Sequence, residues 1–232
     1  MKAIVLFSGG LDSTTCLALA VEKYGRENVT ALSVSYGQKH KKEIEAADKV
    51  ASFYGVNIIR IDFSEIFKSS NCSLLDWSND EIPEKSYVEQ LIERNGSPVS
   101  TYVPFRNGLF LAAAASLAVS LGCEVVYYGA HKDDAAGNAY PDCGAEFNEY
   151  ISKAIYTGSG QQVKVVAPFI DKTKADIVRV GLGLNVPYEM TWSCYEGGDR
   201  PCGKCGTCID RIEAFRKNGR EDPIYGVYKN RE

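Results

Sequence analysis

The sequence predicts an α/β protein with a Rossmann-like, doubly wound and mostly parallel sheet of five strands, followed by a small C-terminal lobe. Three observations support this prediction. Short apolar segments alternate with longer segments of helical periodicity, a Ser-Gly-Gly turn follows the first of them, and four cysteines gather near the C-terminus. At 232 residues the chain is long enough to bury one full core. We therefore expect an α/β domain over residues 1–190 and a cysteine-rich lobe over residues 191–232.

Five apolar segments are the expected strands, and each is nearly continuous in apolar residues, which is typical of a sheet covered on both faces. They comprise residues 2–7, 29–35, 56–62, 124–129 and 163–167. Ligands of such sheets bind at the carboxyl ends of the strands, near the point where the strand order reverses. The loops that follow residues 7, 35, 62, 129 and 167 should therefore surround one pocket.

Helices are expected between the strands because apolar residues recur there at a spacing of three or four. The segment 107–122 is apolar nearly all round, which predicts a central helix. Residues 68–102 interrupt the alternation with turn-rich sequence and a short helical piece near 86–94, so we expect a lid there. Besides a helix that ends near Tyr24, the other expected helices comprise residues 39–55, 146–157, 172–182 and 206–218.

The charge balance argues against a nucleic acid as a stable partner. The formal net charge is −4 and no long run of Lys or Arg occurs, whereas binding to a phosphate backbone usually needs a basic surface. The longest apolar segment, 109–121, is shorter than the ~20 residues that cross a bilayer, and residues 3–7 are too short for a signal peptide. We expect a cytoplasmic protein without disulfides and with no membrane partner.

The turn at residues 7–13, Phe-Ser-Gly-Gly-Leu-Asp-Ser, predicts an anion site. A helix N-terminus offers unpaired N–H groups and a partial positive charge, and glycines let the backbone approach a phosphate. Ser13 would cap this helix. The alternative is a capped helix after a glycine turn, with no ligand. The turn is not a Walker A motif, because no lysine follows the glycines. It resembles the pyrophosphate loop of the N-type ATP pyrophosphatases, which split ATP into AMP and pyrophosphate.

Four cysteines near the C-terminus predict a metal site. The spacing Cys194-x7-Cys202-x2-Cys205-x2-Cys208 suits four thiolates around one tetrahedral zinc ion. A closed shell of four protein ligands leaves no position for water or substrate, so this zinc would be structural. An iron–sulfur cluster and a redox dithiol at Cys205 and Cys208 are the alternatives.

Polar residues also follow the fourth and fifth expected strands. His131, Asp133, Asp134 and Asp142 could hold Mg²⁺ or orient an amine, and an ordinary polar loop is the alternative. Lys174 begins the helix after the fifth strand and could neutralise a leaving pyrophosphate; a solvated surface lysine is the alternative there.

The start of the apolar helix at 107–122 carries a further polar pair. Arg106 and Asn107 could bind a phosphate or a carboxylate at this N-terminus, with Asn107 as the cap.

Several motifs occur together in one order: Phe7 to Leu17, Val103-Pro-Phe-Arg-Asn107, Tyr140-Pro-Asp-Cys143, Trp192-Ser-Cys-Tyr195 and the triplet Cys202, Cys205 and Cys208. Together they resemble the QueC family of 7-cyano-7-deazaguanine synthases, the preQ0-forming enzymes of queuosine biosynthesis. The resemblance covers residues 3–216. It implies a carbon–nitrogen ligase in which the carboxylate of 7-carboxy-7-deazaguanine attacks the α-phosphorus of ATP and ammonia then displaces AMP. A second adenylation, of the amide oxygen, leaves the nitrile.

The resemblance also implies cofactors and site residues. The enzyme would be a homodimer that uses ATP with Mg²⁺ and binds structural zinc through Cys194, Cys202, Cys205 and Cys208. Its catalytic residues would be Asp12, Lys174, Asp134 and Arg106, and its substrate contacts would be Tyr140, Asp142 and Asn107. The ATP loop would comprise Phe7, Ser8, Gly9, Gly10, Leu11, Asp12, Ser13, Thr14, Thr15, Cys16 and Leu17.

Three other functions stay open from the sequence. A tRNA-modifying, thiolation-type member of the superfamily would need a basic RNA-binding surface and unligated cysteines. A nucleotide-binding sensor of the universal stress protein type would bind ATP without releasing AMP. A QueC-like ligase could adenylate a different carboxylate or stop at the amide, because Phe105, Asn138-Ala139 and Gly144 depart from the family pattern.

Overall fold

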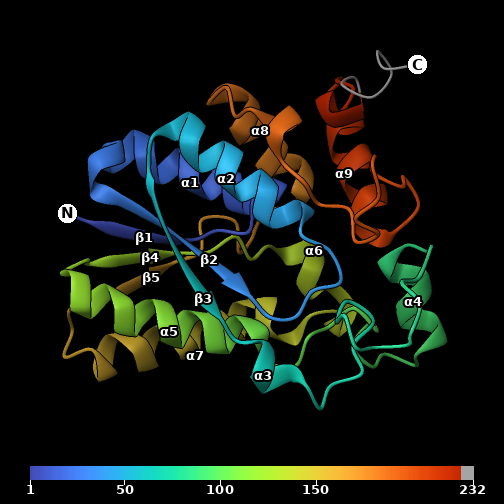
Figure 1. Cartoon of the computed structure of the whole chain (residues 1–232), viewed down its shortest axis with the longest axis horizontal. Helices are drawn as coiled ribbons and strands as arrows, with labels where there is room; N and C mark the ends of the chain where they lie inside the picture. The colour runs from blue at the N-terminus through green and yellow to red at the C-terminus, as the bar shows by residue number, and fades with distance from the viewer. Residues whose placement is uncertain (226–232) are drawn as a thin grey trace.

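A computed structural model describes residues 1–225 of the chain and places five parallel strands in one sheet (Figure 1). The strand order is β3-β2-β1-β4-β5, so the chain reverses its direction of winding between β1 and β4. Each strand lies within one of the five expected segments, which confirms that prediction. The strands are β1 (Ala3–Leu6), β2 (Val29–Ser35), β3 (Asn57–Asp62), β4 (Val125–Tyr127) and β5 (Lys164–Val166).

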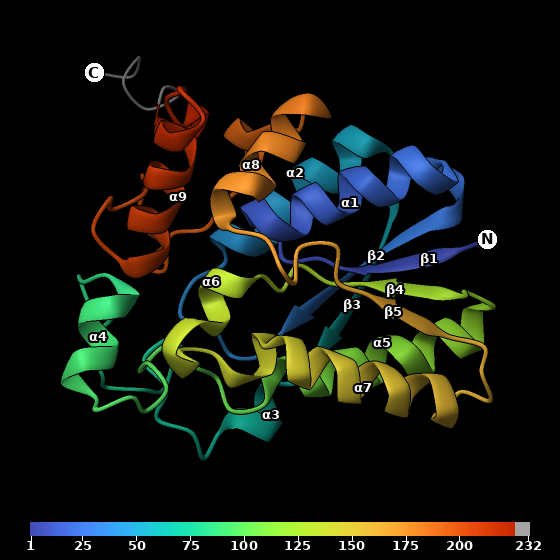
Figure 2. The same cartoon turned by 180° about the vertical axis from the view of Figure 1, so that it is seen from behind.

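Helices cover both faces of this sheet, which is why its strands are apolar on both sides. Helices α1, α2 and α8 lie over one face and α5 and α7 over the other, while α9 lies beside α8 (Figures 1 and 2). The helices are α1 (Leu11–Tyr24), α2 (Lys42–Tyr54), α3 (Ser64–Phe67), α4 (Tyr87–Glu93), α5 (Arg106–Leu121), α6 (Lys132–Ala135), α7 (Ala145–Gly158), α8 (Lys174–Gly183) and α9 (Gly206–Lys217).

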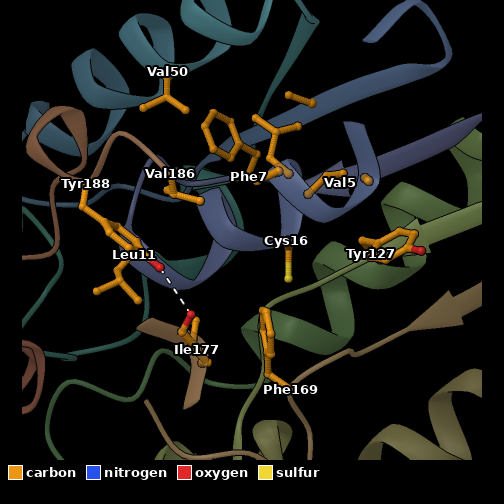
Figure 3. Close-up of a cluster of buried hydrophobic side chains, with 14 of the residues drawn as sticks. Val5, Phe7, Leu11, Cys16, Val50, Tyr127, Phe169, Ile177, Val186 and Tyr188 are labelled. Atoms are coloured by element: carbon orange, nitrogen blue, oxygen red, sulfur yellow. Dashed lines mark hydrogen bonds between the residues drawn. The ribbon is translucent and has the colours of Figure 1, made fainter. Parts of the chain in front are cut away.

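The first strand divides its side chains between two cores because successive residues of a strand point to opposite faces. Ala3 and Val5 join the core beneath α1, α2 and α8, whereas Ile4 and Leu6 join the core beneath α5 and α7. Figure 3 shows the first core, in which Val5 and Cys16 lie beside residues from α8 and the following loop. Both cores meet β1, so the loop that leaves β1 has a rigid base.

The expectation of a central helix at 107–122 is wrong. The stripe of α5 that faces the sheet is fully buried at Leu111, Ala114 and Ala118, but Val119 and Leu121 are each 42% exposed. The reason is geometric: a helix on one face of a two-sided sheet needs only one apolar stripe. The small apolar residues on its other sides lie at the surface.

The segment 68–102 leaves the sheet at its β3 edge and contains the expected short helix as α4. Ser86 caps α4 by accepting a hydrogen bond from the Glu89 N–H, and the Glu89 carboxylate accepts one from the Ser86 N–H. Figure 1 shows α4 beside the N-terminal end of α9. A lid function for this segment stays a prediction. Within residues 1–225 no helix has the length and apolar character that crossing a membrane requires.

Candidate active site

The loop after β1 is held in place by its neighbours as well as by its glycines. Gly9 has φ +85°, and a β-carbon there would lie 2.4 Å from the Ala47 amide nitrogen and 2.5 Å from the Glu43 carbonyl oxygen of α2. Only glycine fits this position, and the reason is close packing against α2. Ser13 does not cap α1, contrary to expectation; Gly10 occupies the N-cap and has no side chain to form a capping bond.

A cavity of about 210 Å³ lies at the carboxyl ends of β1, β2 and β4. This position at the reversal of strand order confirms the expected pocket. No residue directly after β3 lines it among the described residues, so the expected contribution of the loop after residue 62 is wrong. The strand β3 lies at the sheet edge, two strands from the reversal point.

The expected ATP-loop residues divide into two groups. One group lines the cavity, and the other lies on the loop's inner side or on the buried face of α1. Thr15 shows the role of the second group: its Oγ1 lies 2.9 Å from both the Leu11 carbonyl oxygen and the Tyr188 hydroxyl. The lining group is Phe7, Ser8, Gly10, Leu11, Asp12 and Ser13; the supporting group is Gly9, Thr14, Thr15, Cys16 and Leu17.

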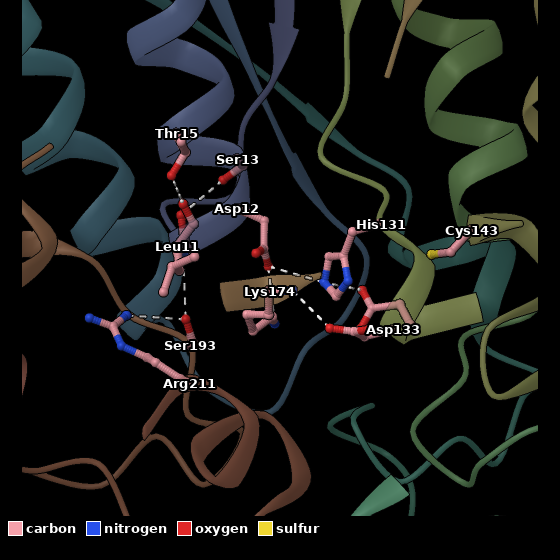
Figure 4. Close-up of polar contacts among 12 residues, drawn as sticks. Leu11, Asp12, Ser13, Thr15, His131, Asp133, Cys143, Lys174, Ser193 and Arg211 are labelled. Carbon is pink, nitrogen blue, oxygen red and sulfur yellow. Dashed lines mark hydrogen bonds and ion pairs between the residues drawn. The ribbon is translucent and has the colours of Figure 1, made fainter. Parts of the chain in front are cut away.

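Charged side chains from three elements meet beside this loop (Figure 4). Lys174 Nζ of α8 lies 3.2 Å from Asp12 Oδ2 of α1. The fully buried His131 places Nε2 3.2 Å from Asp134 Oδ2 and 3.8 Å from Asp12 Oδ2. Asp133 Oδ2 accepts the Lys174 backbone N–H at 2.8 Å, which ties the segment after β4 to the start of α8. The structure therefore brings Asp12, Asp134 and Lys174 together.

The charges in this centre stabilise one another. Burial favours the neutral lysine, but the carboxylates of Asp12, Asp134 and Asp210 raise the pKa of Lys174 overall. Burial likewise opposes ionisation of Asp12, yet Lys174 and His131 lower its pKa. Lys174 and Asp12 are therefore both charged at neutral pH. A buried, protonated lysine thus lies beside the loop after β1. A solvated surface lysine is excluded, since Lys174 is 6% exposed.

A second wall of the cavity is aromatic and basic. The Arg106 guanidinium lies over the Tyr36 ring, 5.0 Å from its centroid, and both residues line the cavity. Phe110 of α5 packs against the same ring. Burial raises the pKa of Glu43 to about 7, against the opposing effect of Arg106. This wall offers a flat surface with a cation and a carboxyl group, which suits a heteroaromatic ring better than a phosphate.

The three expected substrate contacts lie close together but mostly bind one another. Asp142 Oδ2 accepts the Asn107 N–H at 2.7 Å, and Asn107 Nδ2 donates to the Asp142 carbonyl at 3.2 Å. Asn107 is not the cap of α5, contrary to expectation, because Phe105 holds that position with φ +53°. The Tyr140 hydroxyl bonds to Thr101 and Tyr195. Of the three, Asn107 alone lines the cavity, and direct substrate contact by Tyr140 and Asp142 stays a prediction.

The four cysteines of the C-terminal segment form one cluster. One sulfur from each lies within 4.8 Å of the others, and Cys202 Sγ is 4.0 Å from Cys208 Sγ. The backbone N–H groups of Lys204 and Cys205 donate to Cys202 Sγ at 3.4 and 3.3 Å. Four sulfurs this close, with amide donors around them, fit a single metal ion. Cys194, Cys202, Cys205 and Cys208 therefore constitute a potential metal site, as the spacing predicts.

Several residues near the centre were missed by sequence reasoning. Asp210 of α9 acts electrostatically on Lys174, and Glu43 lies on α2 three residues after His40. Ser193 lines the cavity, and Arg211 donates a hydrogen bond to its Oγ at 3.3 Å. The Trp192-Ser-Cys-Tyr195 motif was the one available signal for Ser193. Asp210, Glu43 and Arg211 stand in ordinary amphipathic helices, where nothing marks them.

Comparison with known proteins shows a full-length relationship. A family model described as "Queuosine biosynthesis protein QueC" matches residues 2–219. The 7-cyano-7-deazaguanine synthase of Archaeoglobus fulgidus is 47% identical over 225 residues, which cover 97% of this chain and 90% of that protein. The enzyme of the same name from Caldicellulosiruptor bescii is 43% identical over 226 residues, covering 97% of this chain and 96% of that protein.

Two solved structures share the fold. The U34-tRNA thiolase NcsA from Methanococcus maripaludis, with its 4Fe-4S cluster, superposes with a TM-score of 0.54 at 17% identity, over 94% of this chain and 66% of that one. The NMN synthetase from Francisella tularensis gives a TM-score of 0.51 at 15% identity, over 95% and 78%. At these identities the likeness shows the Rossmann-like α/β fold alone.

Proposed function

Because the chain belongs to the QueC family of queuosine biosynthesis proteins, we propose that it forms 7-cyano-7-deazaguanine from 7-carboxy-7-deazaguanine, ammonia and ATP. The observation that supports this most directly is the ion pair at 3.2 Å between the buried Lys174 and the partly buried Asp12, beside a serine-containing loop at the reversal of strand order. The pair and the loop together offer cationic and N–H donors to a leaving pyrophosphate.

The proposed reaction needs two activations because neither a carboxylate oxygen nor an amide oxygen leaves unaided. The substrate carboxylate attacks the α-phosphorus of ATP, giving an acyl adenylate and pyrophosphate. Ammonia adds to the acyl carbon, loses a proton, and expels AMP to leave the amide. The amide oxygen attacks a second ATP and releases pyrophosphate, and loss of AMP and of both protons on nitrogen then forms the nitrile.

The chain's own residues would act mainly by positioning and by charge. Lys174 is the cation placed to neutralise the departing pyrophosphate, and its burial strengthens that interaction. Arg106 and Tyr36 form the wall proposed for a purine-like ring, because the Arg106 guanidinium lies over the Tyr36 ring, 5.0 Å from its centroid. Asp134 lines the cavity, whereas the fully buried His131 lies behind it and would orient the Asp134 carboxylate.

Asp12 and Asp134 are the residues that would hold Mg²⁺. Asp12 Oδ1 is buried and has no hydrogen-bond partner, and both carboxylates approach the same imidazole nitrogen of His131. Carboxylate oxygens are the protein ligands that Mg²⁺ prefers. When bound, the ion would offset charge on the triphosphate oxygens. Lys174 holds the other oxygen of Asp12 and so leaves Oδ1 available.

Zinc is the proposed occupant of the cysteine cluster. Sulfurs bound at about 2.3 Å in a tetrahedron lie about 3.8 Å apart, which suits four sulfurs within 4.8 Å of one another. Four cysteine ligands leave no open position, so the ion would be structural. Metal analysis of the purified protein should find about one zinc per chain; iron with acid-labile sulfide would replace this proposal by an iron–sulfur cluster.

The decisive test is mass spectrometry of the products formed from 7-carboxy-7-deazaguanine, ammonia and ATP. We expect the nitrile, AMP and pyrophosphate, with pyrophosphate release dependent on the carboxylate. The amide as sole product would indicate a ligase that stops after one activation, and pyrophosphate release with another carboxylate alone would indicate a different substrate. Sulfur incorporation into tRNA without nitrile formation would contradict the proposal.

Three further parts of the proposal concern organisation. We propose a homodimer, a cytoplasmic location, and a division into an α/β domain of residues 1–190 and a zinc lobe of residues 191–232. Sedimentation of the purified protein tests the dimer. Limited proteolysis before and after metal chelation tests the division, because a metal-dependent lobe should become susceptible first.

A further inference from the structure

The segment just before the cysteine cluster lies directly against the loop after β1. The Trp192 N–H donates to the Gly9 carbonyl at 3.0 Å, and Ser193 Oγ lies 3.4 Å from the Leu11 N–H. A β-carbon on Gly10 would come within 3.4 Å of the Trp192 carbonyl oxygen. Residues 192 and 193 are therefore part of the wall of the loop, although 182 positions separate Ser193 from Leu11.

The Ser193 hydroxyl accepts two hydrogen bonds, and its own O–H remains free to donate one. Its Oγ accepts from the Leu11 N–H at 3.4 Å and from Arg211 Nη1 at 3.3 Å (Figure 4). A serine hydroxyl offers two acceptor lone pairs and one O–H donor. With N–H donors on both lone pairs, the O–H must point away from them. Ser193 lines the cavity, so its proton is available to an acceptor there.

Arg211 is fixed so firmly that it acts as a positioning residue. All five of its N–H groups have partners: Nε and Nη2 bind the Asp222 carboxylate at 2.6 and 3.0 Å, and Nη2 also binds the Tyr188 carbonyl at 2.9 Å. Nη1 donates to Thr191 Oγ1 at 2.7 Å and to Ser193 Oγ. Arg211 is 3% exposed. No N–H remains for a phosphate, so its effect on one must pass through Ser193, whose O–H it polarises.

The same loop carries two more serine hydroxyls on its amides. Ser13 Oγ lies 3.2 Å from the Ser8 N–H, and Ser8 Oγ lies 3.2 Å from the Gly10 N–H. Both distances lie at the long end of the range for N–H···O hydrogen bonds, so a better acceptor such as a phosphate oxygen could replace these hydroxyls. Three amides of the loop, at Ser8, Gly10 and Leu11, thus each donate to a serine hydroxyl, and Ser193 supplies the third of these hydroxyls.

We propose that Ser193 is a pyrophosphate-binding residue, contributed to the loop by the segment that leads into the cysteine cluster and oriented by Arg211. This inference rests on the proposed function, because it assigns a ligand to the pyrophosphate that the reaction releases. It gives the cysteine cluster a second consequence: Cys194 adjoins Ser193, so the cluster holds in place the segment that completes the anion site.

The test measures the affinity of the intact protein for inorganic pyrophosphate with Mg²⁺ by calorimetry. Ser193→Ala should weaken pyrophosphate binding about 10- to 100-fold, the effect of one hydrogen bond to a charged group. Its affinity for AMP should change less than about twofold, since AMP lacks the leaving phosphates. Ser193→Thr keeps the hydroxyl and should bind pyrophosphate within about threefold of the natural protein.

Thr191→Val is the matched control, because it removes another Arg211 partner from the same segment without touching the cavity. It should lower the unfolding temperature and leave pyrophosphate affinity within about twofold. If Ser193→Ala does not fold, the isosteric pair Ser193→Thr and Ser193→Val carries the same comparison. If the natural protein releases pyrophosphate in the reaction but binds it equally well with and without the Ser193 hydroxyl, the inference about Ser193 is wrong and the proposed function is unaffected. Failure of the natural protein to release pyrophosphate would instead remove the proposed function.

Discussion

The loop after β1 and the segment after β4 leave neighbouring strands at the same edge of the sheet, yet they use their residues differently. The loop after β1 turns within a few residues and presents amides and short hydroxyl side chains to the cavity. In the segment after β4, polar side chains mainly form hydrogen bonds to other parts of the protein: Asp133 accepts the Lys174 N–H and Asp142 accepts the Asn107 N–H. A loop built from amides and short hydroxyl side chains is therefore a compact sequence motif, whereas the β4 segment builds its part of the site through contacts distant in sequence.

Gly9→Ala is expected to have the largest effect, because it prevents the loop after β1 from packing against α2. The new β-carbon would lie 2.4 Å from the Ala47 nitrogen at a φ of +85°. We expect the unfolding free energy to fall by at least about 3 kcal/mol. We also expect the variant to lose pyrophosphate release. Gly158→Ala is the control, because Gly158 lies in α7 with open space around it. Its unfolding free energy should stay within about 1 kcal/mol of that of the natural protein. A stable, active Gly9→Ala would show that α2 packing does not determine the loop.

Lys174→Met should affect catalysis more than stability and so identify the side chain that both regions hold. Asp12 of the first region pairs with its Nζ, and Asp133 of the second accepts its backbone N–H. Carboxylate-dependent pyrophosphate release should fall about 10²- to 10³-fold, the usual effect of removing one preorganised electrostatic donor. Lys172→Met, an exposed lysine two residues earlier, should retain activity. Equal losses in both variants would argue for a general charge effect.

Asp142→Ala tests whether the β4 segment acts by supporting the site. Its carboxylate accepts the Asn107 N–H at 2.7 Å, so removal should lower the unfolding free energy by about 1–3 kcal/mol. The KM for the deazapurine should change by less than about threefold. Asp171→Ala, an exposed aspartate that pairs with Lys172, serves as control. If stability stays constant and KM rises tenfold, Asp142 contacts the base directly and the contrast between the two regions is smaller.

The effect of Glu43→Gln on stability should depend on pH. Burial raises the pKa of Glu43 from 4.5 to about 7, so the folded protein binds more protons than the unfolded chain between these values. The natural protein should lose stability as pH rises through this window, and glutamine should not. We expect Glu43→Gln to gain up to about 3 kcal/mol of unfolding free energy above pH 7 relative to the natural protein, and nothing below pH 4.5. Denaturant unfolding across pH measures this; parallel curves would contradict it.

The features that the sequence predicts correctly are those that depend on residues close together in the chain. The five strands and the main helices follow from local periodicity, and the cysteine cluster follows from a spacing that already brings sulfurs together. Sequence reasoning failed where an interaction partner was needed. The cap of α1 was assigned to Ser13 and the cap of α5 to Asn107, but Ser13 bonds to Ser8 and Asn107 to Asp142. A cap signal read from residue type alone cannot register such competition.

The amino-acid order alone determined the alternation of strands and helices, the glycine turn at residues 7–13 and the four-sulfur cluster, because each is encoded by residues close together in the chain. Tertiary structure decided that Lys174 is buried against Asp12, that Asn107 binds Asp142, and that Ser193 reaches the Leu11 amide. These pairs are separated by 162, 35 and 182 positions, counted from their residue numbers. Packing across a parallel sheet brings them together at its carboxyl edge, and no local pattern records which distant side chains will meet there.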